Sequence, residues 1–195
     1  GGAGADIFVI GGGTDTITDL SNADVFTVAA GATLNATVTE VWTAASSVRN
    51  QGAVTITSAG FAVDLSAVTT GSAGFTILSI GAAVAFTGSA FADSLTGGNA
   101  DDILNGGAGN DTLIGGIGND ILTGGVGNDV FTIASGMDTI TDLSRSDLVT
   151  VSSGAAVNAI VTGAWTATGG TSNSGSASVT TDGFNVDLSA VTLGS

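Results

Sequence analysis

Residues 106–114 read Gly-Gly-Ala-Gly-Asn-Asp-Thr-Leu-Ile, and this nonapeptide recurs in a fixed register. Residues 115–123 and 124–132 follow it directly, and residues 1–9 are a further copy. Each copy joins a glycine-rich turn of six residues to three residues with an apolar centre. Glycine permits positive φ and close backbone approach, while the apolar centre suits the inward position of a short strand. The pattern therefore predicts glycine-rich turns that alternate with short strands.

An Asp occupies the sixth position of each nonapeptide and recurs every nine residues. The series in the central block is Asp93, Asp102, Asp111, Asp120, Asp129, Asp138 and Asp147, and the series at the start of the chain is Asp6, Asp15 and Asp24. The terminal turns of the central block are degenerate, since residues 88–93 lack two of the glycines and residues 133–150 lack most of them. Degenerate ends are expected where a stack of repeats is capped.

A longer repeat has a period of 123 residues. Residues 1–72 align without a gap on residues 124–195, with about 40 identical positions, and Trp42 corresponds to Trp165. Because the chain ends inside the second copy, we expect it to be a piece of a longer array.

The tandem nonapeptides resemble the RTX calcium-binding repeat family over residues 88–150 and again over residues 1–27. The resemblance implies a parallel β-roll, a right-handed β-solenoid in which two nonapeptides make one coil. Residues 18 apart would then stack on the same flank. It also implies export of the unfolded chain by bacterial type I machinery and calcium-driven folding outside the cell. The expected fold class is all-β: an RTX β-roll plus adjoining β-rich segments.

Such stacking would arrange the aspartates in two ladders. One ladder would hold Asp93, Asp111, Asp129 and Asp147, and the other would hold Asp102, Asp120 and Asp138. Strands in a stack lie about 4.8 Å apart, and two carboxylates at about 5 Å repel by about 3 kcal/mol at an effective dielectric constant of about 20. Calcium, with oxygen ligands at about 2.3–2.6 Å, fits between the rungs better than magnesium does. We therefore expect several calcium ions, with five inter-rung gaps in the central block.

Further ligands come from the first copy and from the turns. In the first copy only Asp6 and Asp24 share a flank, and Asp15 is a candidate on the other flank. Asp19 and Asp142 begin the degenerate last turn, where they either cap the final site or are solvated. Turn carbonyls would complete the coordination; the candidates are Gly107, Gly109, Gly116, Gly118, Gly125 and Gly127. Asp101 is interpreted as a turn residue, and Asp64 and Asp187 as solvent-facing.

The sequence divides into four parts. Residues 1–27 are the end of an RTX roll, residues 28–87 a β-rich linking module, residues 88–150 an RTX roll, and residues 151–195 the start of a second module. Partial apolar–polar alternation predicts strands in the modules, which either continue the stack or form a small sandwich against it. Trp42 and Trp165 are expected to be core anchors. Ile103 and Ile121, 18 residues apart, should face outward and mark either a self-association face, a surface covered by residues 28–87, or scattered surface residues.

Composition excludes many functions. The 195 residues include 17 acidic residues but only two arginines and no Lys, His or Cys, for a net charge of −15. The usual zinc sites, cysteine nucleophiles and Ser-His-Asp triads cannot be built from these residues. The negative charge argues against binding to nucleic acid. No apolar stretch is long enough for membrane insertion, and no signal peptide is expected in this piece.

The sequence therefore predicts a non-enzymatic, calcium-binding structural repeat of a secreted bacterial cell-surface or extracellular assembly protein, such as a surface layer, adhesin or filament. Self-association into a homopolymer or array is the expected partnership, besides the type I export machinery in transit. The alternative is the calcium-dependent export and folding domain of a type I-secreted protease, lipase or toxin. Extracellular calcium sites with dissociation constants of about 10⁻⁴–10⁻³ M would fill only outside the cell.

Overall fold

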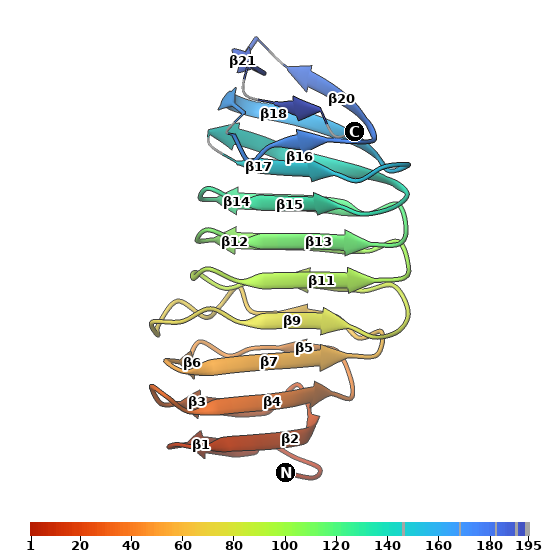
Figure 1. Cartoon of the computed structure of the whole chain (residues 1–195). Coiled ribbons are helices and arrows are strands. Elements are labelled where there is room, and N and C mark those ends of the chain that lie inside the picture. The colour runs from red at the N-terminus through yellow and green to blue at the C-terminus, as the bar shows by residue number, and fades with distance from the viewer. Residues whose placement is uncertain (146, 168, 182, 190, 194–195) are drawn as a thin grey trace.

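The computed structural model describes every residue of the chain except 146, 168, 182, 190 and 194–195. The strands pair in parallel and stack into an elongated solenoid, with the N- and C-termini near its opposite ends (Figure 1). None of the described residues lies in a helix, so none forms a helix that could cross a membrane. The predicted all-β class and parallel β-roll are confirmed.

Two long sheets run along the solenoid. The ten-stranded sheet contains, in spatial order, β2 (Thr14–Leu20), β4 (Thr33–Val38), β7 (Ala53–Ser58), β9 (Thr76–Ser79), β11 (Ser94–Gly98), β13 (Thr112–Gly116), β15 (Val130–Ile133), β17 (Leu148–Val151), β19 (Ser172–Asn173) and β22 (Thr192–Leu193). The nine-stranded sheet contains β5 (Trp42–Thr43), β8 (Val63–Asp64), β10 (Ala85–Thr87), β12 (Ile103–Ala108), β14 (Ile121–Val126), β16 (Met137–Arg145), β18 (Ala156–Thr166) and β20 (Ser176–Thr181), with β21 (Val186–Asp187) also pairing with β18. A short third sheet contains β1 (Ile7–Ile10), β3 (Val25–Val28) and β6 (Arg49–Asn50).

The central roll has two strands in each coil. Paired residues in β11–β13, β12–β14 and β13–β15 are 18 positions apart, as two nonapeptides require. The predicted inward side chains are fully buried in the core, namely Leu95, Leu104, Leu113, Leu122, Phe131 and Ile140. Burial of side chains of this size removes about 1.5–3 kcal/mol each of unfavourable hydration. Apolar packing along the axis and backbone pairing between coils therefore hold the roll together.

The linking module continues the same stack and does not form a separate sandwich. Its coils contain three strands, β3-β4-β5 and then β6-β7-β8, and paired residues lie 20 to 23 positions apart. The extra residues of each coil supply a third side, occupied by β3 and β6. Strands β7 and β8 then pair directly with β9 and β10 of the following coil. A three-sided module thus passes into a two-sided roll without a break in the two long sheets.

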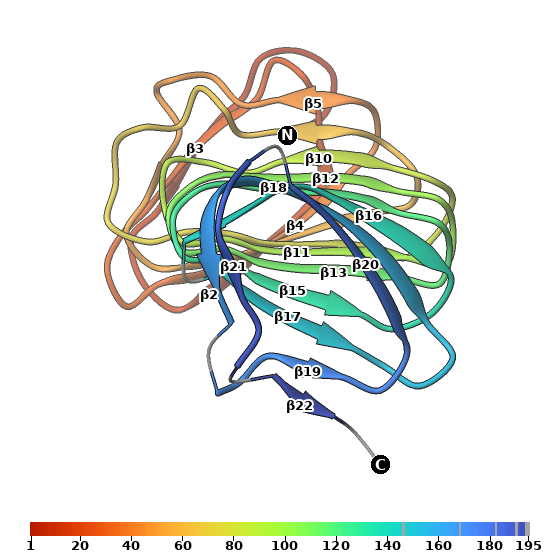
Figure 2. The same ribbon diagram turned by 90° about the horizontal axis from the view of Figure 1, so that it is seen from above.

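The two copies of the module join the long sheets by different sides. Strands β2, β4 and β7 belong to the ten-stranded sheet, whereas their counterparts 123 residues later, β16, β18 and β20, belong to the nine-stranded sheet. Strands β3 and β6 form the short third sheet, whereas their counterparts β17 and β19 extend the ten-stranded sheet. Figure 2 accordingly shows the two modules extending beyond the outline of the roll in different directions.

Candidate metal site

Each aspartate of the roll lies where a glycine-rich turn meets a strand. Asp93, Asp102 and Asp111 directly precede β11, β12 and β13, and their carbonyls accept hydrogen bonds from Thr112, Ile121 and Val130 of the next coil. The apolar residue two positions after each aspartate is anchored in the core. The strand ladder therefore fixes each carboxylate at the same place in every coil.

The carboxylates form the two predicted ladders, but the rungs are linked by hydrogen bonds. In each rung one carboxylate oxygen, Oδ1, accepts a hydrogen bond from the backbone N–H of the residue 18 positions earlier. On one flank Phe75, Asp93, Asp111 and Asp129 donate to Asp93, Asp111, Asp129 and Asp147 at 2.6 to 2.9 Å, and on the other flank Val84, Asp102 and Asp120 donate to Asp102, Asp120 and Asp138 at 2.8 to 3.0 Å.

The second carboxylate oxygen, Oδ2, is buried and has no hydrogen-bond partner in several rungs. These rungs are Asp102, Asp111, Asp120 and Asp138 in the roll and Asp6 in the first copy. A buried polar atom without a partner costs free energy, and an ionised one costs more. An oxygen of this kind in successive coils indicates a ligand that the protein itself does not provide.

Burial raises the pKa of every aspartate in the two ladders of the roll from its ordinary value. The pKa of Asp111 rises to about 7 and those of Asp138 and Asp147 to about 6, chiefly because burial disfavours the charged form. Hydrogen bonds from the backbone oppose this rise, whereas neighbouring carboxylates of the same ladder add to it, as Asp93 and Asp129 do for Asp111. Without a cation, the ladders are therefore electrostatically strained at neutral pH.

The first glycine of each nonapeptide makes room for the carboxylate. A Cβ atom added at Gly97, Gly106 or Gly115 would overlap Oδ2 of the aspartate five residues later. The second glycine has positive φ at Gly107, Gly116 and Gly125, each of which is paired with a glycine of a neighbouring coil. Of the other candidate glycines, Gly109 and Gly118 have positive φ, and a Cβ added at Gly127 would overlap the carbonyl of Gly109. The turns are thus packed too tightly for any larger residue.

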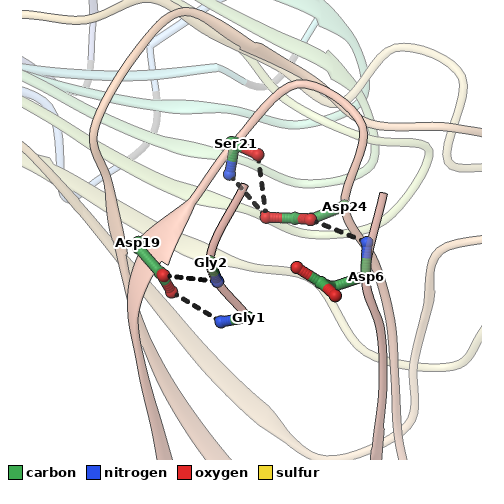
Figure 3. Close-up of polar contacts among 6 residues, drawn as sticks. All are labelled: Gly1, Gly2, Asp6, Asp19, Ser21 and Asp24. Atoms are coloured by element: carbon green, nitrogen blue, oxygen red, sulfur yellow. Dashed lines mark hydrogen bonds and ion pairs between the residues drawn. The ribbon is translucent and has the colours of Figure 1, made fainter. Parts of the chain in front are cut away.

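The first copy shows the same arrangement at smaller scale. Asp6 N–H donates to Oδ1 of Asp24 at 3.0 Å, so these two aspartates do share a flank (Figure 3). Asp15 is exposed in β2, and among the described residues no hydrogen bond reaches its carboxylate. Its counterpart Asp138 is buried in the ladder, so equivalent sequence positions differ in exposure.

Asp19 and Asp142 cap turns through their carboxylates. Asp19 accepts hydrogen bonds from the backbone nitrogens of Gly1 and Gly2 at 3.0 and 2.9 Å (Figure 3). Asp142 accepts from Gly124 and Gly125 at 2.9 and 2.7 Å. The interaction is therefore repeated in both copies, and both oxygens of each carboxylate are engaged.

Three serines not predicted from the sequence bond the end carboxylates of one ladder of the roll and the carboxylate of Asp24 in the first copy. Ser89, Ser21 and Ser144 donate their backbone N–H to Oδ2 of Asp93, Asp24 and Asp147, at 2.5 to 2.8 Å. Each serine stands in a degenerate turn, three or four residues before its aspartate. Asp93, Asp147 and Asp24 therefore have both oxygens bonded by protein, whereas Asp102 and Asp138, at the ends of the other ladder, do not.

Trp42 and Trp165 end the ladder that runs through Asp24 and Asp147. Each lies 18 residues after that aspartate, and its Nε1–H donates to the aspartate carbonyl, at 3.4 Å for Trp42 and 3.0 Å for Trp165. Both indoles are buried, as expected of core anchors. An apolar ring thus follows the last carboxylate of the column.

The other aspartates singled out in the sequence accept backbone hydrogen bonds, and the two isoleucines lie at the surface. Asp101 is exposed, and its Oδ1 accepts a hydrogen bond from the Asn119 N–H at 2.8 Å, as a turn residue would. Asp64 and Asp187 accept from Ser66 and Ser189, two residues ahead, at 2.8 and 2.9 Å. Ile103 and Ile121 pair in register and are 52% and 43% exposed, so residues 28–87 do not cover them.

The donor set fits a hard divalent cation. Within the described residues no three acidic, His or Cys side chains cluster together, and each turn of the roll offers a single buried ladder carboxylate. The buried donors are carboxylate and backbone oxygens, which calcium prefers. Asp102, Asp111, Asp120 and Asp138, with a buried unpartnered oxygen each, would hold such ions, together with Asp129 on the same ladder as Asp111. When bound, the cation would offset the charge of these carboxylates.

Comparison with known proteins agrees with this chemistry. The model of the RTX calcium-binding nonapeptide repeat matches four times, over residues 1–32, 86–113, 96–131 and 106–140. No curated protein and no solved structure matches the chain. The matched segments contain the glycine turns and ladder aspartates described above, except for Asp147 and its neighbours. Residues 1–32 and 86–140 of this chain are therefore RTX calcium-binding repeats, folded as parts of one β-solenoid.

Proposed function

We propose that the chain is a structural repeat of a secreted bacterial cell-surface or extracellular assembly protein, which folds on binding calcium after export. RTX repeats bind calcium, and proteins that carry them are typically secreted. The observation that carries the proposal is the buried, unpartnered Oδ2 atom in successive coils of the roll. A charged chain with unsatisfied carboxylates would remain unfolded at low cytosolic calcium and fold where extracellular calcium is abundant.

A calcium titration followed by far-UV circular dichroism tests this proposal. We expect a coil-to-β transition at roughly 10⁻⁵–10⁻³ M calcium, with no transition at the same concentrations of magnesium. A chain that is equally folded in chelator would contradict calcium-driven folding, because core packing alone would then hold the solenoid.

A second candidate function rests on the same repeats. The roll could serve as the calcium-dependent export and folding domain of a type I-secreted protease, lipase or toxin. The 123-residue repeat favours the first proposal, since repeated modules build length. The sequence encoded beside this segment separates the two: further copies of the repeat support assembly, and an adjoining hydrolase motif supports the secreted enzyme.

Self-association through the outer face of β12 and β14 is part of the assembly proposal. Ile103 and Ile121 are adjacent on that face and about half exposed. Replacing both with Thr should reduce light scattering by assembled protein at saturating calcium, while the calcium midpoint stays unchanged. Unchanged assembly would remove these side chains from the interface.

A further inference from the structure

Asn105 and Gly106 form the only Asn-Gly dipeptide of the sequence. Both residues lie in β12, inside the central roll. An asparagine followed by glycine is prone to deamidation, because a residue without a Cβ leaves its backbone nitrogen accessible and free to turn. That nitrogen can then attack the side-chain carbonyl carbon of the asparagine. The sequence therefore contains one position at which this reaction is chemically favoured.

The reaction balances with water as its only co-reactant. The backbone nitrogen of Gly106 forms a bond to Cγ of Asn105, the bond from Cγ to the side-chain nitrogen breaks, and this nitrogen leaves as ammonia with the proton of the backbone amide. The product is a succinimide ring. Water opens the ring at either of its carbonyls, which gives aspartate or isoaspartate. In isoaspartate the main chain runs through the side-chain carbon.

The folded roll holds this dipeptide in a conformation in which the ring cannot close. Asn105 pairs in register with Thr87 of β10 on one side and with Thr123 of β14 on the other. Its carbonyl accepts a hydrogen bond from the Gly88 N–H at 2.7 Å. In a parallel strand ψ is about +115°, which turns the following nitrogen away from the side chain. Ring closure would rotate this peptide and break the pairing with both neighbouring coils.

Packing around Gly106 opposes the same rotation. Gly106 is buried, and a Cβ added to it would overlap Oδ2 of Asp111 and the carbonyl of Gly124. The side chain of Asn105, in contrast, is half-buried on the outer face of the sheet. Protection of the dipeptide therefore comes from its fixed backbone and not from exclusion of water.

We propose that Asn105 is a deamidation site that is closed in the folded roll and open in the unfolded chain, so that calcium-driven folding protects it. The calcium dependence rests on the proposed function, whereas the site rests on the Asn-Gly sequence and the strand geometry. Isoaspartate here would add a carbon atom to the backbone of β12 directly before the tightly packed Gly106. A chain that deamidates before it folds would thus lose the register that brings Asp111 into its ladder.

The test incubates the chain at mildly alkaline pH with saturating calcium, with chelator, or with chelator and urea. Mass spectrometry then measures deamidation in the peptide that contains Asn105, and chromatography separates aspartate from isoaspartate. We expect the rate to be at least roughly tenfold lower with calcium than with chelator, because stable structure suppresses local opening. The peptides that contain Asn99-Ala100 and Asn158-Ala159 are internal controls and should react more slowly than Asn105 in urea.

Circular dichroism of the same samples distinguishes the two ways in which the experiment can fail. Equal rates with calcium and with chelator, in a chain that is folded in the first and unfolded in the second, would overturn the proposal. So would the absence of reaction at Asn105 in urea. A chelated chain that is folded and reacts only in urea would contradict calcium-driven folding but would support a site that the fold closes.

Calcium added back after the incubation in chelator provides a second measurement. The unaltered chain should lose its β-structure signal in proportion to its isoaspartate content. The matched control is Asn105→Thr, which introduces the residue that Thr123 places at the paired position of the next coil. This variant should refold completely after the same incubation. Complete refolding of the unaltered chain despite its isoaspartate would contradict the loss of register.

Discussion

The two oxygens of an interior roll aspartate have different surroundings. Oδ1 accepts a backbone N–H from the previous coil, whereas Oδ2 of Asp111 is buried without a partner. The first oxygen serves the fold, and the second is available to a cation. Coil stacking and the proposed calcium binding would therefore depend on the same side chain through different atoms.

Replacing Asp111 with Asn separates the two roles. The amide oxygen can still accept the Asp93 N–H, but the negative charge is lost. We expect the calcium midpoint measured by circular dichroism to rise by roughly tenfold, the effect of losing about 1.4 kcal/mol of binding, while the fold at saturating calcium persists. Asp101→Asn, on an exposed carboxylate of the roll, is the matched control and should titrate like the unaltered chain. An unchanged midpoint for Asp111→Asn would remove this residue from the site.

The first glycine of each nonapeptide turn leaves space for the carboxylate of the aspartate five residues later. In Gly106→Ala the new Cβ would overlap Oδ2 of Asp111, so we expect destabilisation by about 1–3 kcal/mol in urea unfolding with calcium present. Gly12→Ala is the control, because no atom lies within 4 Å of its added Cβ. Equal stability of the two variants would mean that the turn around Gly106 has room to relax.

Sequence reasoning placed the ladder aspartates well and missed their serine partners. A strict nine-residue spacing predicts which carboxylates share a flank, because equal spacing places them at equal points of successive coils. Ser21, Ser89 and Ser144 carry no such period, and they act only through the local shape of degenerate turns. A serine three or four residues before a terminal aspartate is the signal that could have identified them.

At the scale of the element, each nonapeptide turn of the roll places a buried carboxylate beside the apolar core. The folded pKa values of Asp111, Asp138 and Asp147 lie above those of the unfolded chain. The calcium-free roll therefore binds more protons than the unfolded chain at intermediate pH. The stability that these carboxyl groups contribute is fully present below the ordinary pKa of Asp. It is lost as the pH rises through about 6–7, the pKa range of these groups in the folded roll.

The calcium-free roll should therefore be more stable at about pH 5 than at about pH 7.5. Far-UV circular dichroism of the chelated protein across this pH range measures the difference, as a gain of β-structure at the lower pH. The calcium-loaded protein should not gain in the same way, because protons compete with calcium for the carboxylates. Calcium-free protein that is less stable at about pH 5 would show that the buried carboxylates do not control the stability of the roll.

The strands of the roll could be read from the sequence, but those of the linking module only in part. In the roll, nine-residue periodicity fixes strand, turn and register together. In the module, coils of 20 to 23 residues lack a constant period, so sequence left open whether the module stacks or forms a sandwich. Its buried polar groups are uncharged, such as Asn50 and Ser58, which form hydrogen bonds within their own turns, and Asn50 also donates to the carbonyl of Gly74 in the next coil.

At the scale of the whole molecule, blocks of coils with ladder aspartates and blocks of coils without them follow one another along one axis. In a solenoid each coil contacts only its neighbours, so stability can differ along the stack. Without calcium, amides of β4 and β7 should exchange more slowly than those of β12 and β14, because the module has no buried ladder carboxylate. Adding calcium should slow exchange mainly in β12 and β14, as measured by mass spectrometry. Uniform exchange in both states would indicate that the solenoid opens as a single cooperative unit.

The two copies of the module join the long sheets by different sides, and this difference determines which surfaces a longer rod of such repeats would expose. A side of the module that lies in the ten-stranded sheet in one copy lies in the nine-stranded sheet in the next. A chemical group carried by one side of the module would thus point in a different direction in each successive copy. A rod of such repeats would have no continuous binding surface along one side. If such rods associate as proposed, they would touch only at intervals along their length.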